Sequence, residues 1–313
     1  MTDDLAALVD RARAGDRASL ARLITLAERG GVEARAVSRL VHGLGGSTYT
    51  VGVTGSPGAG KSTLTNSLCS LLRASGDEVA VLSIDPSSPF SGGALLGDRV
   101  RMTSHTLDDG VYIRSMATRG HLGGLSVATP QAVRVLDAVG TPWVIIETVG
   151  VGQVEVEVAG AADTVIVVMN PGWGDAVQAN KAGLMEIADI FVINKSDRPG
   201  AGDTRRDVEQ MLSMRDRSGW WPPVIDTVAT TGAGVAELLD AVASHRRHLV
   251  DSGELERRRR TRAEAELRAV IAAELAERAR TVGDDAGFDA AVEAILGRSL
   301  DPWSAASQLL PPA

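Results

Sequence analysis

A glycine-rich stretch, GSPGAGKS, occupies positions 55–62, between the apolar segment TVGVT and the segment TLTNSLCSLL. In a phosphate-binding loop, this pattern lies between a strand and a helix, and successive backbone N–H groups point at the phosphates. Lys61 would reach the β- and γ-phosphates, and the Ser62 hydroxyl would bind Mg²⁺. The expected nucleotide-binding residues of this loop are Gly55, Ser56, Pro57, Gly58, Ala59, Gly60, Lys61, Ser62 and Thr63.

The tetrapeptide NKSD, from Asn194 to Asp197, follows the apolar run IFVI and can select the base. The Asp197 carboxylate can accept from both N1–H and the 2-amino group of guanine, whereas adenine has no such amine and presents an acceptor at N1. Adenine would leave that carboxylate unpaired, at a cost of about 1 to 3 kcal/mol. The stem of Lys195 can cover one face of the base. Together with the phosphate loop, NKSD predicts GTP rather than ATP as the ligand.

The segment WVIIETVG places an acid, Glu147, after a run of apolar residues and a glycine, Gly150, three positions later. Such an acid can hold Mg²⁺ through its water shell, and the Gly150 N–H can meet the γ-phosphate. Most GTPases carry Asp at this place, so Glu147 keeps the acid but lengthens the arm. Asp85, at the end of another strand, and Asp98, in a glycine-rich stretch, are further candidates for the metal shell, although each fits a capped loop equally well. The candidate Mg²⁺ ligands are thus Ser62, Asp85, Asp98 and Glu147.

A glutamine is missing where Ras-like GTPases use one to position the attacking water. That residue follows the glycine directly, and here the position is held by Val151, with Gln153 two positions further on. Nothing in the sequence nominates a replacement. We therefore expect slow unaided hydrolysis, which suits a switch better than a turnover enzyme.

The whole chain of 313 residues is 44% hydrophobic and has a formal net charge of −8 and a pI near 5.2. This balance argues against nucleic acid or a membrane surface as a partner, because both are bound mainly through a surplus of Lys and Arg. The single cysteine, Cys69, excludes an internal disulfide and a paired-cysteine zinc site, and its leucine neighbours predict a buried thiol. The N-terminal sequence has no signal-like apolar segment, and no run approaches the ~20 residues of a membrane span. We therefore expect a cytoplasmic protein.

The fold must bring these residues together. From Tyr49 to about Ala229, short apolar segments alternate with longer helical or loop segments. This alternation predicts an α/β fold, with a mostly parallel sheet covered by helices on both faces and ligands beyond the C-terminal ends of the strands. The predicted organisation is an N-terminal helical segment (1–46), a P-loop GTPase domain (47–250) and a C-terminal helical arm (251–313). Asp16 and Asp301 are expected helix N-caps. The arginines of residues 257–260 are interpreted as a solvated helix face rather than a binding patch.

Five longer segments extend the motifs: GSPGAGKST, IDPSSPFSGGALLGDRVRM, RGHLGGLS, ETVGVGQVEVEVA and NPGWGDAVQANKAGLMEIADIFVINKSD. Together they resemble the MeaB/ArgK family, the GTPase chaperones of adenosylcobalamin-dependent methylmalonyl-CoA mutase. The resemblance covers essentially the whole GTPase domain. It implies a homodimer to which the C-terminal arm contributes. It also implies a protein that gates cofactor loading into the mutase and protects the mutase, while the mutase accelerates GTP hydrolysis.

The resemblance also implies roles for particular residues. Asp85, Asp98 and Glu147 would belong to the Mg²⁺ and catalytic environment, beside Lys61. Residues 86–119 would form the first mobile switch and residues 148–158 the second.

A further switch of the family signals to the mutase, and its Asp, Gln and Lys match Asp175, Gln178 and Lys181. The family's SALTGxG-like base-binding segment reads VATTGAG here. A serine side-chain contact is therefore missing, while backbone contacts from Ala229 and Thr230 are still expected.

Three other functions fit parts of the sequence. A GTPase that delivers nickel or serves another metallocentre could use His245 and His248, three apart on a predicted helix, although the five histidines are scattered. A small-molecule kinase would need an acceptor pocket and an acceptor base, which the motifs do not supply. A structural dimer that binds GTP without hydrolysis would show no partner-stimulated phosphate release.

Overall fold

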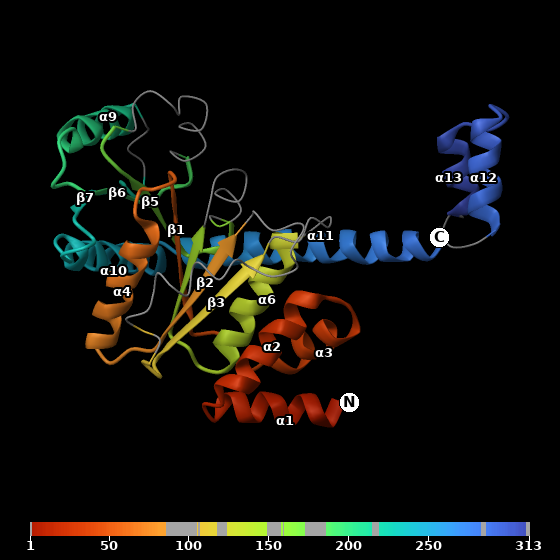
Figure 1. Ribbon diagram of the computed structural model, residues 1–313, viewed down its shortest axis with the longest axis horizontal. Helices are drawn as coiled ribbons and strands as arrows, with labels where there is room; N and C mark the ends of the chain where they lie inside the picture. The colour runs from red at the N-terminus through yellow and green to blue at the C-terminus, as the bar shows by residue number, and fades with distance from the viewer. Residues whose placement is uncertain are drawn as a thin grey trace. The chain divides into compact units, whose positions relative to one another are not determined.

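The computed structural model of the chain describes residues 2–85, 105, 107–117, 124–148, 158, 160–172, 186–214, 219–282 and 286–310 (Figure 1). Its strands are β1 (Tyr49–Gly55), β2 (Val79–Asp85), β3 (Val111–Ala117), β4 (Trp143–Thr148), β5 (Thr164–Met169), β6 (Ile190–Asn194) and β7 (Val224–Thr227). Its helices are α1 (Thr2–Arg13), α2 (Arg17–Arg29), α3 (Gly31–Val41), α4 (Lys61–Ala74), α6 (Gly124–Ala138), α9 (Ala201–Ser213), α10 (Val235–Asp251), α11 (Glu254–Val282), α12 (Ala286–Leu296) and α13 (Pro302–Leu309).

The seven strands form one sheet in the order β3-β2-β4-β1-β5-β6-β7, and all its neighbouring strands pair in parallel. β1 lies in the middle, between β4 and β5. Every residue of β5 from Thr164 to Met169 is buried, because a parallel strand covered on both faces reads as a continuous apolar run. The predicted α/β fold with a mostly parallel sheet is confirmed.

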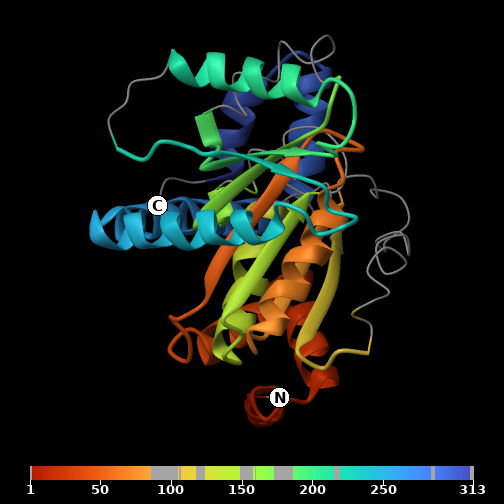
Figure 2. The same ribbon diagram turned by 90° about the vertical axis from the view of Figure 1, so that its left-hand side faces the viewer.

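Helices cover both faces of the sheet (Figure 2). On one face α4 and α10 pack through Leu64 and Leu238 against strand residues that include Ile166. On the other face α6 packs through Leu136 and α9 through Val208. The central strands are therefore held from both sides, which fixes the edge where their C-terminal ends meet.

The N-terminal helices α1, α2 and α3 belong to the same core as α6, beside which they lie in Figure 1. Leu23 and Ile24 of α2 are fully buried in this cluster. As expected, Asp16 caps α2, since its carboxylate accepts from the Ala18 N–H at 3.1 Å. The N-terminal segment is helical, as the sequence predicts.

Cys69 lies on α4 with no exposed surface, among Leu68 and Leu72. Burial raises the pKa of the Cys69 thiol to about 12. The thiol is therefore protonated and packed, which confirms the predicted buried cysteine.

The prediction that residues 257–260 form a solvated helix face is wrong for Arg258 and Arg259. Arg258 pairs with Asp189 at 2.9 Å, and Arg259 pairs with Asp163 at 3.1 Å. Both carboxylates are buried, and a buried carboxylate is stable only with a paired charge and hydrogen bonds. Arg257, by contrast, has 64% of its side chain exposed.

The chain divides into two compact units, Met1–Ala263 and Glu264–Ala313, and α11 begins in the first and continues into the second. We keep the three predicted segments, 1–46, 47–250 and 251–313, as a proposed organisation. In the second unit Asp301 caps α13, as expected, by accepting from the N–H groups of Trp303 and Ser304.

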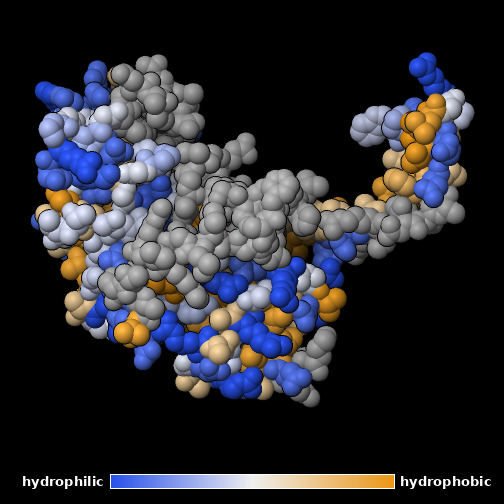
Figure 3. Space-filling model, viewed as in Figure 1, coloured by the Kyte–Doolittle hydropathy of each residue, from blue (hydrophilic) through white to orange (hydrophobic). Residues whose placement is uncertain are grey.

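Large apolar side chains are exposed on the second unit, and Figure 3 shows hydrophobic atoms gathered over α12 and α13. Those on α11 recur every four residues and so share one side of the helix. The exposed apolar residues of the unit include Leu267, Ile271, Leu275, Phe288, Val292, Leu296 and Trp303.

Within the part of the chain that the structure describes, no helix has both the length and the apolar character of a membrane span.

Candidate functional site

The motifs predicted from the sequence meet at one edge of the sheet, where parallel strands place their C-terminal ends. The glycine-rich loop follows β1, Glu147 lies near the end of β4, and NKSD begins with the last residue of β6. Because β4, β1, β5 and β6 are consecutive in the sheet, these loops are neighbours. This is the edge at which open α/β sheets bind ligands.

The glycine-rich loop turns tightly from β1 into α4. Gly60 has a φ of 93° in the left-handed region, and a Cβ built there would lie 2.4 Å from Nδ2 of Asn194. Only glycine therefore fits between the loop and β6. The N-terminus of α4 begins at Lys61, directly after the loop, so its first N–H groups and positive dipole end lie where a phosphate would bind.

Lys61 is buried, with 7% of its surface exposed. Its ammonium group donates to the carbonyl oxygens of Gly55 at 2.7 Å and Ser56 at 3.1 Å. The charge is thus held inside the curve of the loop, in the position from which it can pair with phosphate oxygens.

The Ser62 hydroxyl donates a hydrogen bond to Oε1 of Glu147. Glu147 has 1% of its surface exposed and pairs with Val53 of β1 and Ser83 of β2 in the sheet register. A hydroxyl and a carboxylate oxygen are donors of the kind that Mg²⁺ prefers, so this pair fits the predicted metal position. The longer arm of Glu, compared with Asp, reaches the first turn of α4.

The other predicted metal ligands are placed only in part. Asp85 is the last residue of β2, beside β4 in the sheet, so its backbone lies at the same edge. Asp98 lies outside the described residues, as do Gly150, Val151 and Gln153.

Asn194 joins three loops of the site. Its Nδ2 donates to the carbonyl oxygen of Ala59 at 2.8 Å, and its Oδ1 accepts from the Ala229 N–H and the Thr227 hydroxyl, both at 3.1 Å. Its side chain is buried, so these bonds are made away from water. Asn194 thereby fixes the loops after β6 and β7 against the phosphate loop.

Lys195 and Asp197 lie at the surface beside that junction. Lys195 has a φ of 58° and donates from Nζ to the Gly58 carbonyl oxygen at 2.6 Å. Its stem therefore runs along the phosphate loop, which is compatible with covering a base. Asp197 is exposed, as a base-reading carboxylate must be to meet its ligand.

The loop after β7 holds the two residues expected to contact the base through their backbone. The Ala229 N–H donates to Asn194, and the Ala229 carbonyl accepts from the Ser67 hydroxyl of α4 at 2.8 Å. Thr230 is exposed. In this arrangement the backbone of Ala229 holds the loop in place.

Asn170 is a residue of the site that the sequence analysis does not single out. It follows β5, and its Oδ1 accepts from the Ser56 hydroxyl at 3.2 Å, while its Nδ2 donates to the Pro171 carbonyl at 3.2 Å. The available signal is an asparagine at the end of an apolar strand, the same pattern that marks Asn194.

The three residues expected to signal to a partner, Asp175, Gln178 and Lys181, lie outside the described residues. Of the two expected switches, the structure describes residues 105 and 107–117 of the first and residues 148 and 158 of the second. Their roles stay predictions.

His245 and His248 do not form an open metal-binding pair. His245 is fully buried, with Nδ1 2.8 Å from the Thr164 hydroxyl and Nε2 3.3 Å from Oδ1 of Asp189. Burial lowers the pKa of His245 to about 4, against the opposing charge of Asp189. Trp220 packs on both imidazole rings, at 4.8 Å and 5.3 Å between centroids. Across the described residues, no group of three or more His, Cys, Asp or Glu side chains could hold a metal ion.

Comparison with known proteins gives consistent matches. The family model described as methylmalonyl Co-A mutase-associated GTPase MeaB matches residues 20–284. A putative GTPase of Pyrococcus horikoshii is 48% identical over 307 residues, which cover 97% of this chain and 96% of the relative. The GTPase ArgK of Escherichia coli is 39% identical over 265 residues, covering 80% and 79%.

Among solved structures, one titled as a LAO/AO transport system kinase is 31% identical to this chain. The two superpose with a TM-score of 0.71, covering 97% of this chain and 96% of the other. The similarity therefore extends over both units rather than the phosphate loop alone.

Proposed function

Because the chain belongs to the methylmalonyl Co-A mutase-associated GTPase MeaB family, we propose that it is a G-protein chaperone of an adenosylcobalamin-dependent mutase. It gates the loading of the cofactor into methylmalonyl-CoA mutase, or a related acyl-CoA mutase, and protects that enzyme. The chain is a GTPase. The observation that supports guanine nucleotide as the ligand is the direct connection, through Asn194, of the base-reading loop to the phosphate loop.

The nucleotide lies along the edge formed by these loops. Backbone N–H groups from Ser56 to Thr63 and the ammonium of Lys61 bind the phosphates, with the N-terminus of α4 adding its dipole. Asp197 accepts from N1–H and the 2-amino group of guanine, and the stem of Lys195 covers the base. Gly150 donates its N–H to the γ-phosphate.

Ser62 and Glu147 would hold Mg²⁺, with Asp85 and Asp98 as further members of its shell. The ion would supply positive charge that neutralises the charge developing on the phosphates during phosphoryl transfer. Ser62 and Glu147 already share a hydrogen bond, so their oxygens converge on one point.

In this proposal, GTP hydrolysis is slow until the partner binds. Val151 stands where a water-positioning glutamine would be expected, so unaided turnover is slow. Residues 86–119 and 148–158 act as switches that respond to the γ-phosphate. Asp175, Gln178 and Lys181 carry the response to the mutase and return its signal.

The protein forms a homodimer in the cytoplasm, and the C-terminal arm contributes to the contact. The stripe of Leu267, Ile271 and Leu275 supports this, since each of the three side chains is about half exposed or more. Three large apolar residues on one side of a helix favour association with another apolar surface.

The test is the rate of GTP hydrolysis by the pure protein in Mg²⁺ buffer, with and without methylmalonyl-CoA mutase. We expect a slow basal rate that rises tenfold or more, equivalent to about 1.4 kcal/mol of barrier. Lys61→Ala serves as the control for contaminating phosphatase, because it removes the phosphate-binding charge. An unchanged rate would remove this mutase as the partner while leaving the GTPase activity in place.

A further inference from the structure

Two buried carboxylates lie at the edge of the sheet opposite the nucleotide loops. Asp163 immediately precedes β5, and Asp189 immediately precedes β6. Their side chains are 1% and 6% exposed. Neither carboxylate takes part in the nucleotide site, so their burial requires another explanation.

Arginines from the first turns of α11 neutralise both carboxylates. Arg258 donates two hydrogen bonds of 2.9 Å to Asp189, and Arg259 and Arg262 both bond to Asp163. Positions 258, 259 and 262 share one side of a helix. Burial alone would raise the pKa of Asp163, but hydrogen bonds from Arg259 and the charges of Arg262 and Arg259 hold it below its ordinary value. We call this set of five residues the arginine clamp.

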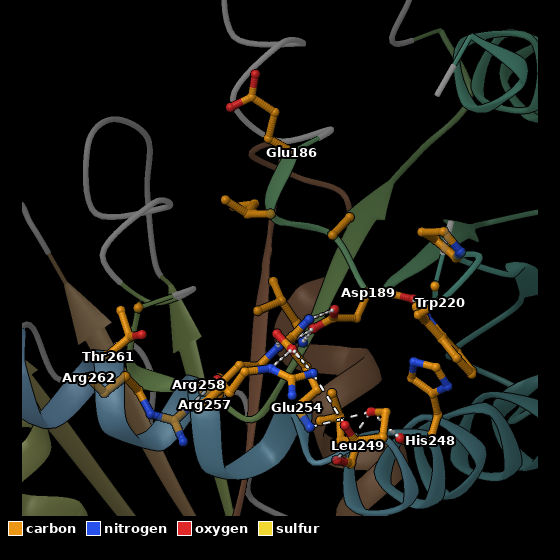
Figure 4. A pocket seen from close by; sticks show the side chains of 18 residues that line it. Glu186, Asp189, Trp220, His248, Leu249, Glu254, Arg257, Arg258, Thr261 and Arg262 are labelled. Atoms are coloured by element: carbon orange, nitrogen blue, oxygen red, sulfur yellow. Dashed lines mark hydrogen bonds and ion pairs between the residues drawn. The ribbon is translucent and has the colours of Figure 1, made fainter. Parts of the chain in front are cut away.

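The clamp lies beside a cavity of about 840 Å³ whose walls include Trp220, His248 and clamp residues (Figure 4). Arg257, which also lines this cavity, bonds instead to Glu254 of its own helix. Figure 4 shows Arg258 and Asp189 meeting at the wall, with Trp220 beside Asp189. The Trp220 indole donates to the Asp189 backbone carbonyl at 2.7 Å, which further fixes the start of β6.

The same carboxylates hold the starts of the central strands. Asp163 accepts from the Thr50 N–H of β1 at 3.1 Å, and Asp189 accepts from the Val165 N–H of β5 at 2.9 Å. Arg259 also donates to the carbonyl of Thr48 at 3.0 Å. Each carboxylate therefore joins α11 to the first residues of strands that continue into the nucleotide site.

At their other ends these strands carry the nucleotide loops. β1 leads into the phosphate loop, β5 leads to Asn170 beside Ser56, and β6 ends at Asn194. Strands of five to seven residues span about 15 to 25 Å at roughly 3.3 Å per residue. Each is hydrogen-bonded to neighbours on both sides, so each strand is a continuous, well-held connection between the carboxylates and the nucleotide loops.

We propose that Arg258 and Arg259, through Asp189 and Asp163, are positioning residues of the nucleotide site that couple the docking of α11 to the binding of guanine nucleotide. α11 continues beyond Ala263 into the second unit. A change in the second unit that alters the docking of α11 would therefore affect nucleotide binding through the clamp. The inference needs only the GTPase activity and not the identity of the partner, so it stands or falls separately from the mutase proposal.

Thermodynamic linkage makes the coupling measurable in both directions. If α11 docking favours nucleotide binding, nucleotide must favour α11 docking by the same factor. In the unmodified protein we expect GDP with Mg²⁺ to slow backbone amide hydrogen exchange in the first turns of α11, residues 254–262, by threefold or more. These amides are remote from the ligand, so direct contact cannot account for the slowing.

The variant test compares Arg258→Met and Arg259→Met with Arg257→Met, the matched control whose side chain is largely exposed and bonds to Glu254 of the same helix. We expect each clamp variant to raise the GDP release rate at least fivefold and to remove the slowing of exchange. Arg257→Met should change neither. Arg259→Lys, which keeps the charge, should recover part of the lost affinity.

A clamp that serves stability alone gives a different result. Clamp variants would then lower the melting temperature while GDP release stayed within twofold of the unmodified protein, and the proposal would be overturned. The exchange measurement on the unmodified chain covers the case in which a clamp variant fails to fold. No response of residues 254–262 to GDP would equally refute the coupling.

Discussion

The amide nitrogen of Asn194 donates to the carbonyl oxygen of Ala59 at 2.8 Å, which ties the end of β6 directly to the phosphate loop. The oxygen of the same amide accepts from Ala229 and Thr227. One buried side chain therefore sets the spacing between the loop that binds phosphates and the two loops expected to surround the base.

Replacing Asn194 with Ala removes all three hydrogen bonds and should weaken GDP binding at least tenfold. The reason is that the buried Ala59 carbonyl and Ala229 N–H lose their partners, at about 1 to 3 kcal/mol for each group left unpaired. Titration with a fluorescent GDP analogue measures the loss. Thr227→Val removes one of the three bonds and should give a smaller effect. An Asn194→Ala protein that bound GDP normally would show that the junction does not organise the site.

Asp197→Asn should shift the base preference away from guanine. The amide keeps one acceptor, which can meet N1–H, but it places an NH2 donor opposite the 2-amino group of guanine. The same NH2 can donate to the 2-oxo group of xanthine. We expect GTP affinity to fall by a factor of ten or more and xanthosine triphosphate to bind better than GTP. Competition between the two nucleotides measures the change. Retention of guanine preference would exclude Asp197 as the base-reading residue.

Gln178→Ala and Lys181→Ala should spare basal hydrolysis while weakening its stimulation by the mutase. The expectation follows from the proposed signalling role of these residues rather than from contact with nucleotide. Phosphate release with and without the mutase separates the two effects. Lost basal activity in either variant would place that residue in the nucleotide site instead.

His245 should make the protein less stable in mild acid. Its folded-state pKa of about 4 is below the 6.5 of an unfolded histidine, so the unfolded chain binds a proton that the folded chain refuses between those values. The contribution of His245 to the free energy of unfolding is therefore complete above pH 6.5 and is lost as the pH falls towards 4. The free energy of unfolding should fall by about 3 kcal/mol over this range, because the pKa of His245 is lowered by roughly 2.5.

The measurement is the free energy of unfolding in urea at several pH values from 7 to 4. His245→Asn should flatten this dependence, whereas His248→Gln, at the half-buried position beside Trp220, should leave most of it. The same slope in His245→Asn as in the unmodified protein would assign the acid sensitivity to other groups.

The sheet and the nucleotide motifs could be predicted because their signals are local. β5 reads TVIVVM, and a run of β-branched residues of that length indicates a strand covered on both faces. The glycine-rich loop and NKSD each occupy one short segment, and each lies at the C-terminal end of an apolar strand. Their meeting at one edge follows from the parallel arrangement alone.

The clamp could not be predicted, because its partners are far apart in sequence and their relation depends on the fold. Arg258 and Asp189 are separated by 69 residues, and a run of arginines at the start of a charged helix is usually a solvated face. The sequence marks Asn170 only as an asparagine at the end of an apolar strand, and its partner could not be predicted for a related reason. Its bond to Ser56 exists only because β5 is adjacent to β1 in the sheet.

The chain contains one cysteine, Cys69, and it lies without exposed surface on α4 with a thiol pKa of about 12. Thiolate is the form that reacts with maleimides and disulfide reagents, so we expect the folded native protein to react very slowly with thiol labels. A cysteine introduced at an exposed position such as Leu107 would be the sole labelled site. Spectroscopic probes of this GTPase can therefore be placed one at a time without first removing a native residue.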